Sequence, residues 1–122
     1  MATIAVIDDA RCDLDLICAI LHDANHTALR FQSPANVETR IASAQPDLVL
    51  LDVIMPARSG YEVLRRLRRR GAATADIPVV LVTSKTDPVD RAWGLRQGAD
   101  GYVTKPFTPE QLLGEVDRHL AS

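Results

Sequence analysis

Five polar residues at the ends of apolar runs carry the groups that phosphoryl-transfer chemistry requires. They are Asp8, Asp9, Asp52, Thr83 and Lys105. Three carboxylates repel one another when they are crowded, so gathering them is costly unless they share a cation. Hard oxygen ligands suit Mg²⁺, a lysine can meet a phosphoryl group, and a threonine hydroxyl can donate a hydrogen bond to a phosphoryl oxygen. Together these residue types indicate a nucleophile with a metal, a cation and a hydroxyl donor.

Short apolar runs alternating with amphipathic segments would position these residues. Leu48–Leu51 contains no charge and runs straight into Asp52, which is typical of a strand buried on both faces of a parallel sheet. The same reasoning predicts strands at 3–7, 28–31, 48–51, 79–82 and 101–104 and helices at 11–24, 34–44, 61–70, 88–97 and 108–120. Parallel strands place their carboxyl ends at one edge of the sheet, where open α/β sheets bind ligands. We therefore expect an α/β fold that forms one domain over 1–122, with helices on both faces of a parallel sheet.

Turn and cap residues locate several helix ends. Ser33-Pro34 reads as an N-cap followed by proline at the first helical position. Gly71 and Gly98 read as C-caps. Thr108 and Gln111 have the spacing of a capping box.

Composition indicates a soluble globular protein with no strong electrostatic bias. The chain has 122 residues, 47% of them hydrophobic, and a net charge of −2. No apolar run approaches the roughly 20 residues needed to cross a bilayer, and no nucleic-acid-reading motif is present. We expect neither membrane nor nucleic acid as a partner. Cys12 and Cys18 are predicted to be free thiols in a reducing cytosol, which makes the cytoplasm the expected location.

Nearly the whole chain, residues 4 to 121, resembles the receiver domain of two-component response regulators. The matching stretches are Ala5-Val6-Ile7-Asp8-Asp9, Leu50-Leu51-Asp52-Val53-Ile54-Met55-Pro56 with Gly60, Val82-Thr83-Ser84, and Gly101-Tyr102-Val103-Thr104-Lys105-Pro106-Phe107. The resemblance implies a flavodoxin-like (βα)5 fold with a five-stranded parallel sheet in the order 2-1-3-4-5.

The resemblance also implies the roles of the acidic residues. Asp52 would be the phosphorylated aspartate. Asp9, Asp52 and the backbone carbonyl of Ile54 would hold Mg²⁺, and Asp8 would contact it through water. The departure from the family pattern is Ala10, where a serine or another capping residue is more common.

Further roles follow from the same resemblance. Thr83 and Lys105 would take phosphoryl oxygens, and the Lys105–Pro106 bond would be cis. Tyr102 would be an aromatic switch that enters space vacated when Thr83 moves toward the phosphoryl group; its alternative is an edge-strand aromatic that covers apolar surface. Ile54 and Lys85 would flank the path of hydrolytic water.

Function is expected to follow from this chemistry. The leading hypothesis is a stand-alone regulator that a histidine kinase phosphorylates and that signals to a protein partner through the 88–120 face. The chain would be no enzyme beyond its own phosphoryl transfer and autodephosphorylation. Residues 93–99 resemble single-domain regulators of type IV pilus twitching motility, with chemotaxis regulators as neighbours. The alternatives are a phosphate sink and a phosphatase of the haloacid dehalogenase type, although Ile54 stands where that family has a second acid.

Other conspicuous residues receive structural interpretations. Trp93 is expected to anchor its helix by packing, or otherwise to contact a partner. The five arginines between 65 and 70 are expected to form a solvated helix face, with a partner or nucleic-acid patch as the alternative. His22, His26 and His119 lack metal-site spacing and are expected at the surface.

Overall fold

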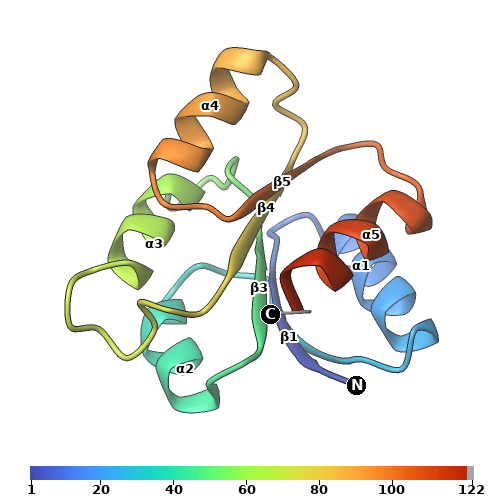
Figure 1. Ribbon diagram of the computed structural model, residues 1–122, viewed down its shortest axis with the longest axis horizontal. Helices are drawn as coiled ribbons and strands as arrows, with labels where there is room; N and C mark the ends of the chain where they lie inside the picture. The colour runs from blue at the N-terminus through green and yellow to red at the C-terminus, as the bar shows by residue number, and fades with distance from the viewer. Residues whose placement is uncertain (121–122) are drawn as a thin grey trace.

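The computed structural model describes residues 1–120 as five strands alternating with five helices (Figure 1). The strands are β1 (Thr3–Ile7), β2 (Thr27–Phe31), β3 (Leu48–Leu51), β4 (Val79–Thr83) and β5 (Gly101–Thr104). The helices are α1 (Arg11–Asp23), α2 (Val37–Ala44), α3 (Gly60–Leu67), α4 (Pro88–Arg96) and α5 (Pro109–Leu120).

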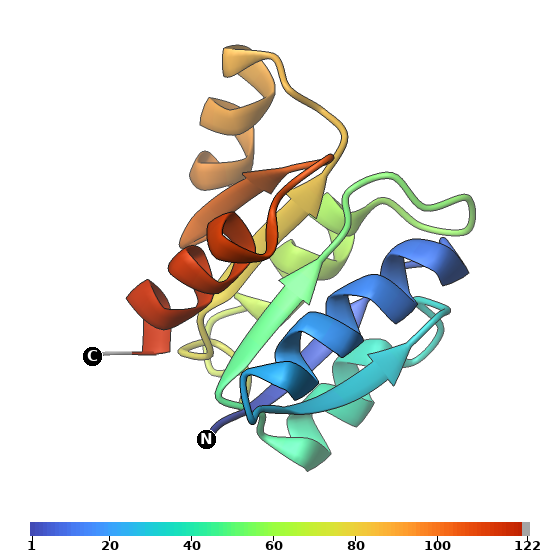
Figure 2. The same cartoon turned by 90° about the vertical axis from the view of Figure 1, so that its right-hand side faces the viewer.

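All neighbouring strands are parallel, and their order in the sheet is β2-β1-β3-β4-β5. Figures 1 and 2 show α1 and α5 on one face of the sheet and α2, α3 and α4 on the other. The predicted strand order and the predicted two-sided covering by helices are therefore confirmed. The arrangement places the carboxyl ends of all five strands at one edge.

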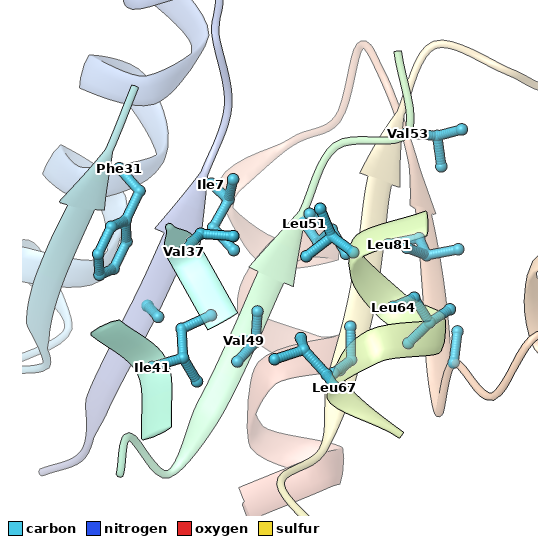
Figure 3. Close-up of a cluster of buried hydrophobic side chains, with 14 of the residues drawn as sticks. Ile7, Phe31, Val37, Ile41, Val49, Leu51, Val53, Leu64, Leu67 and Leu81 are labelled. Atoms are coloured by element: carbon cyan, nitrogen blue, oxygen red, sulfur yellow. The ribbon is translucent and has the colours of Figure 1, made fainter. Parts of the chain in front are cut away.

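Two apolar clusters fill the space between the sheet and its helices. Because strand side chains alternate between faces, successive residues of β3 enter different clusters. Val49 and Leu51 join α2 and α3 in the first cluster, which Figure 3 shows. Leu48 and Leu50 join α1 and α5 in the second. All four side chains are buried, which explains why β3 is apolar throughout.

The predicted start of α2 is wrong. Ser33 does not cap a helix, because its Oγ accepts a hydrogen bond from the backbone N–H of Ala35 in a local turn. Asn36, with φ of 56°, is the residue that precedes the helix, and regular helix begins at Val37. Val37 is buried, and Val37 and Ile41 anchor the helix to the core. Because the backbone of Asn36 is left-handed, a regular helix cannot run from Pro34 into α2.

The predicted end of α3 is also wrong. The helix stops at Leu67, so Gly71, although it has a φ of 81°, lies beyond the helix end and is not its cap. Arg68 leaves the helical path, and its guanidinium donates to the carbonyls of Ile77 (2.6 Å) and Gly98 (3.0 Å) and to Asp100 (2.6 Å). Of the five arginines expected on a solvated face, Arg68 is therefore mostly buried, whereas Arg65, Arg66, Arg69 and Arg70 are exposed.

The other two predicted caps are confirmed. Gly98 follows α4 and has a φ of 109°. Its N–H donates to the carbonyl of Leu95, and the N–H of Ala99 donates to the carbonyl of Gly94. That pair of hydrogen bonds is a Schellman motif. Thr108 and Gln111 exchange reciprocal side-chain to backbone bonds of 3.1 and 2.9 Å at the start of α5.

Within residues 1–120, none of the helices has the length and apolar character that a membrane crossing requires.

Candidate functional site

The register of β1 and β3 brings Asp8 and Asp52 together. Ile7 pairs with Leu51, and the backbone N–H of Asp52 donates to the carbonyl of Ile7 at 3.0 Å. Each aspartate therefore leaves the sheet at the same level. Both side chains are buried, with about 1% of Asp8 and 6% of Asp52 exposed. The carboxylates are held close by the sheet itself, which is why their proximity could be predicted from two strand ends.

Asp9 completes an acidic cluster with Asp8 and Asp52. One carboxylate oxygen from each residue lies within 4.8 Å of the others. Burial raises the pKa of Asp8 above its ordinary value, although hydrogen bonds from Lys105 and the N–H of Ala10 oppose the shift. Hard oxygen donors at this spacing, one of them half-exposed, fit the needs of Mg²⁺, which binds a few carboxylates and retains water.

Lys105 lies among these carboxylates. Its Nζ donates to Asp8 at 2.7 Å and to Asp13 at 3.0 Å, and it lies 3.5 Å from Asp52. Burial alone would lower the pKa of Lys105, but the hydrogen bonds to Asp8 and Asp13 and the charge of Asp52 raise it overall. The lysine is therefore a charged counter-ion that the acidic cluster holds beside Asp52.

The chain after β5 fixes the position of Lys105. Its backbone N–H donates to the carbonyl of Thr83 at 2.8 Å, which ties the end of β5 to the end of β4. The Lys105–Pro106 peptide bond is cis, as the resemblance predicted. Thr83 is fully buried at the same edge of the sheet, and the N–H of Lys85 lies 3.4 Å from its Oγ1.

The sequence interpretation missed Asp13 as a partner of Lys105. Asp13 lies in the first turn of α1, and no residue type at the start of that helix marks where it begins. Ala10 precedes the helix without a side-chain cap. Asp13 could have been noticed only from its closeness in sequence to Asp8 and Asp9.

Tyr102, the predicted switch residue, has a buried ring in this structure, and its entry into space vacated by Thr83 stays a prediction. Only 3% of Tyr102 is exposed, and its hydroxyl donates to the carbonyl of Lys85 at 2.8 Å. Gly94 makes room for it, since a Cβ there would lie 3.3 Å from the ring and 2.7 Å from Leu81. Tyr102 thus covers apolar core and also holds the loop after Thr83.

The loop between β3 and α3 passes close to the acidic cluster. The N–H of Ile54 donates to Asp52 Oδ1 at 3.2 Å, and the Ile54 side chain is exposed. Gly60 opens α3 where a Cβ would approach the carbonyl oxygen of Asp52 to 2.1 Å. Only glycine allows the helix to start this close to Asp52.

Several singled-out residues lie away from the site. Trp93 does not anchor α4, because it is about half exposed, and the buried residue of α4 is Gly94. Cys12 and Cys18 are free thiols, the first exposed and the second buried. His22 is exposed, whereas His119 is largely covered and lies 3.3 Å from Glu115.

Comparisons with known proteins agree with this geometry. Residues 4–117 match the family model described as the response regulator receiver domain. The chain is 36% identical to the protein PilH of Pseudomonas aeruginosa, and the match covers 99% of each. The phosphate regulon transcriptional regulatory protein PhoB of the same organism is also 36% identical, but the chain spans about half of its length.

Solved structures show the same fold. The chemotaxis protein CheY4 of Vibrio cholerae superposes with a TM-score of 0.90 at 28% identity, covering 98% of this chain and 99% of that one. The beryllofluoride-activated receiver domain of RstA from Klebsiella pneumoniae superposes with a TM-score of 0.89 at 30% identity, with similar coverage. By its sequence and by its fold, this chain belongs to the response regulator receiver domain family.

Proposed function

We propose that this receiver takes a phosphoryl group from a histidine kinase onto Asp52 in a Mg²⁺-dependent reaction. The observation that carries the proposal is the buried Asp52 carboxylate, which clusters with two further acids and lies beside the Lys105 ammonium. Asp8, Asp9, Asp52 and the carbonyl of Ile54 would hold the metal. When bound, Mg²⁺ would neutralise charge on the phosphoryl oxygens.

Each residue around Asp52 has a separate role in the proposed reaction. The Asp52 carboxylate is the nucleophile. The N–H of Ile54 holds its Oδ1, and Oδ2 attacks phosphorus while the P–N bond to the kinase's phosphohistidine breaks and the histidine leaves. Lys105 supplies a positive charge to the phosphoryl group that arrives. The hydroxyl of Thr83 donates to a phosphoryl oxygen once the loop after β4 moves toward the site. Ile54 and Lys85 flank the approach of the water that later hydrolyses the acyl phosphate.

The phosphorylated protein would signal to a protein partner through the 88–120 face, in the manner of a single-domain regulator. Three large apolar side chains of α4, those of Val89, Trp93 and Leu95, are exposed. The likeness to PilH and to CheY4 supports a role in pilus-based motility or chemotaxis.

Intact mass spectrometry after incubation with acetyl phosphate and Mg²⁺ tests the reaction. Wild type should gain one phosphoryl group, and the gain should disappear when EDTA replaces Mg²⁺. Asp52→Asn should remain unmodified while its circular dichroism spectrum is unchanged. Phosphoryl incorporation into Asp52→Asn would refute the assignment of the nucleophile. Turnover of small phosphate esters by wild type would instead favour a phosphatase.

A pulldown distinguishes signalling from a phosphate sink. The beryllofluoride-bound protein should retain a partner that the unliganded protein does not, and Trp93→Ala should reduce that retention. A protein that accepts phosphoryl groups but whose partners do not prefer the activated form would instead act as a sink for its kinase.

A further inference from the structure

Asp13 stands at the third position of α1, the position whose side chain completes a capping box where one is present. In such a box, the acid accepts the N–H of the residue that precedes the helix. Here that residue is Ala10, which has no side chain to reciprocate and whose N–H is already bound by Asp8 Oδ1 at 2.9 Å. The Asp13 carboxylate therefore does not cap the helix, and it accepts a hydrogen bond from the Lys105 ammonium instead.

The ammonium of Lys105 has three N–H donors and three carboxylates around it. Asp8 and Asp13 lie at 2.7 and 3.0 Å, whereas Asp52, the phosphoryl acceptor under the proposed function, is the most distant at 3.5 Å. Asp8 and Asp52 are almost completely buried, but 43% of the Asp13 side chain is exposed. Asp13 is thus the partner that water can most readily replace.

We propose that Asp13 is a positioning residue that holds Lys105 in the unphosphorylated state and competes with the phosphoryl group for it. The inference rests on the proposed function and deepens it. A phosphoryl group on Asp52 needs a short contact with the ammonium, and the ammonium must loosen its contact with Asp13 to provide one. The Asp13 contact therefore favours the unphosphorylated arrangement and limits how strongly the site stabilises a phosphoryl group.

The competition predicts opposite effects on two ligands when Asp13 is replaced. In Asp13→Asn, Lys105 loses a charged partner and becomes freer to contact a phosphoryl oxygen. Beryllofluoride, the phosphoryl mimic, should bind about two- to fivefold more tightly at saturating Mg²⁺, the size expected for a half-exposed ion pair. Mg²⁺ alone should bind more weakly, because the freed ammonium then opposes a second cation.

Asp15→Asn provides a matched control on the same helix. Asp15 pairs with Arg30 at the surface. Replacing Asp15 with asparagine removes the same negative charge as Asp13→Asn does. Titrations followed by ¹⁹F NMR for beryllofluoride and by calorimetry for Mg²⁺ would compare wild type with both variants, and urea unfolding would compare their stabilities.

The expected result is tighter beryllofluoride and weaker Mg²⁺ binding in Asp13→Asn only. Weaker binding of both ligands would mean that the variant merely loosens the site, and equal changes in Asp15→Asn would mean a nonspecific charge effect; either result overturns the inference. A wild type that binds beryllofluoride normally while Asp13→Asn behaves like wild type overturns the inference alone. A wild type that neither binds beryllofluoride nor accepts a phosphoryl group overturns the proposed function as well.

Discussion

At the scale of single residues, the site combines buried carboxylates with one lysine that they share. Asp8 and Asp52 are buried side by side, and Lys105 is shared with Asp13. The convergence of Asp8, Asp52 and Lys105 was predictable, because parallel strands place their ends at one edge whatever the side-chain details. The contact with Asp13 was not, because it depends on the rotation of a helix whose first residue lacks a recognisable cap.

Asp8 should destabilise the metal-free protein at neutral pH. Burial raises its pKa above the ordinary aspartate value of 3.8, so the folded state binds the proton more tightly than the unfolded state does. The contribution of Asp8 to the free energy of unfolding is therefore favourable at low pH. It is lost as pH rises from about 3.8 through the pKa of folded Asp8.

The variant Asp8→Asn should remove that loss, because asparagine does not titrate. Urea unfolding in EDTA at several pH values should show the variant more stable than wild type at pH 7, with the difference shrinking toward pH 4. Asp23→Asn, at an exposed position of α1, serves as the control and should follow wild type. A variant that is less stable than wild type at pH 7 would show that the ion pair with Lys105 outweighs the cost of burial.

At the scale of helices and strands, some helix ends follow from local sequence signals and others do not. The caps of α4 and α5 were predictable, because Gly98 and the Thr108–Gln111 pair act through the backbone of their own helix. The ends of α2 and α3 were not, because distant residues decide them. Arg68 follows the last residue of α3, and its guanidinium donates hydrogen bonds to Ile77, Gly98 and Asp100. These acceptors lie too far along the chain for a local sequence pattern to indicate them.

Arg68 should stabilise the fold by joining the end of α3 to the starts of β4 and β5. Its guanidinium serves three acceptors, and Asp100 Oδ2 also accepts the N–H of Val79 at 2.9 Å. Arg68→Met keeps the aliphatic stem but leaves those acceptors without the cation, which should lower the free energy of unfolding by about 2 kcal/mol. Urea denaturation would measure this loss.

Arg69→Met is the matched control, because Arg69 is the exposed neighbour of Arg68. It should change stability by less than about 0.5 kcal/mol. Arg68→Lys should fall between the two, since a lysine cannot reproduce the planar fork of donors. Equal stabilities for Arg68→Met and Arg69→Met would show that water replaces the guanidinium at no cost.

Across the whole molecule, the sheet edge with the acidic cluster is linked to the most exposed helix. Figure 1 shows α4 at the margin of the fold beside β5, and its buried residue is Gly94. The link runs from Thr83 to Lys85 in the loop after β4, and from the Lys85 carbonyl to the Tyr102 hydroxyl. A helix with so little buried surface is free to change its position at small energetic cost. The helical spacing around Trp93 could not reveal this, because the residue that packs is a glycine.

Tyr102→Phe should weaken the link between the site and α4 without changing the acidic cluster. The substitution keeps the ring that packs on Gly94 and removes only the hydrogen bond to Lys85, worth about 1 kcal/mol. Amides of 85–97 should then exchange with deuterium about fivefold faster in the unliganded protein. The change that beryllofluoride produces in those amides should shrink, while its affinity stays within about twofold of wild type.

Tyr61→Phe separates this effect from the general loss of a hydroxyl. The Tyr61 hydroxyl is buried and has no hydrogen-bond partner among the described residues, so its removal should leave stability equal or slightly higher. Exchange in 85–97 should remain as in wild type. If Tyr102→Phe kept the full response of α4 to beryllofluoride, the bond to Lys85 would be a structural contact only. The displacement of Thr83 would then have to reach α4 through the backbone of residues 84–87, and the buried ring of Tyr102 would serve the core alone.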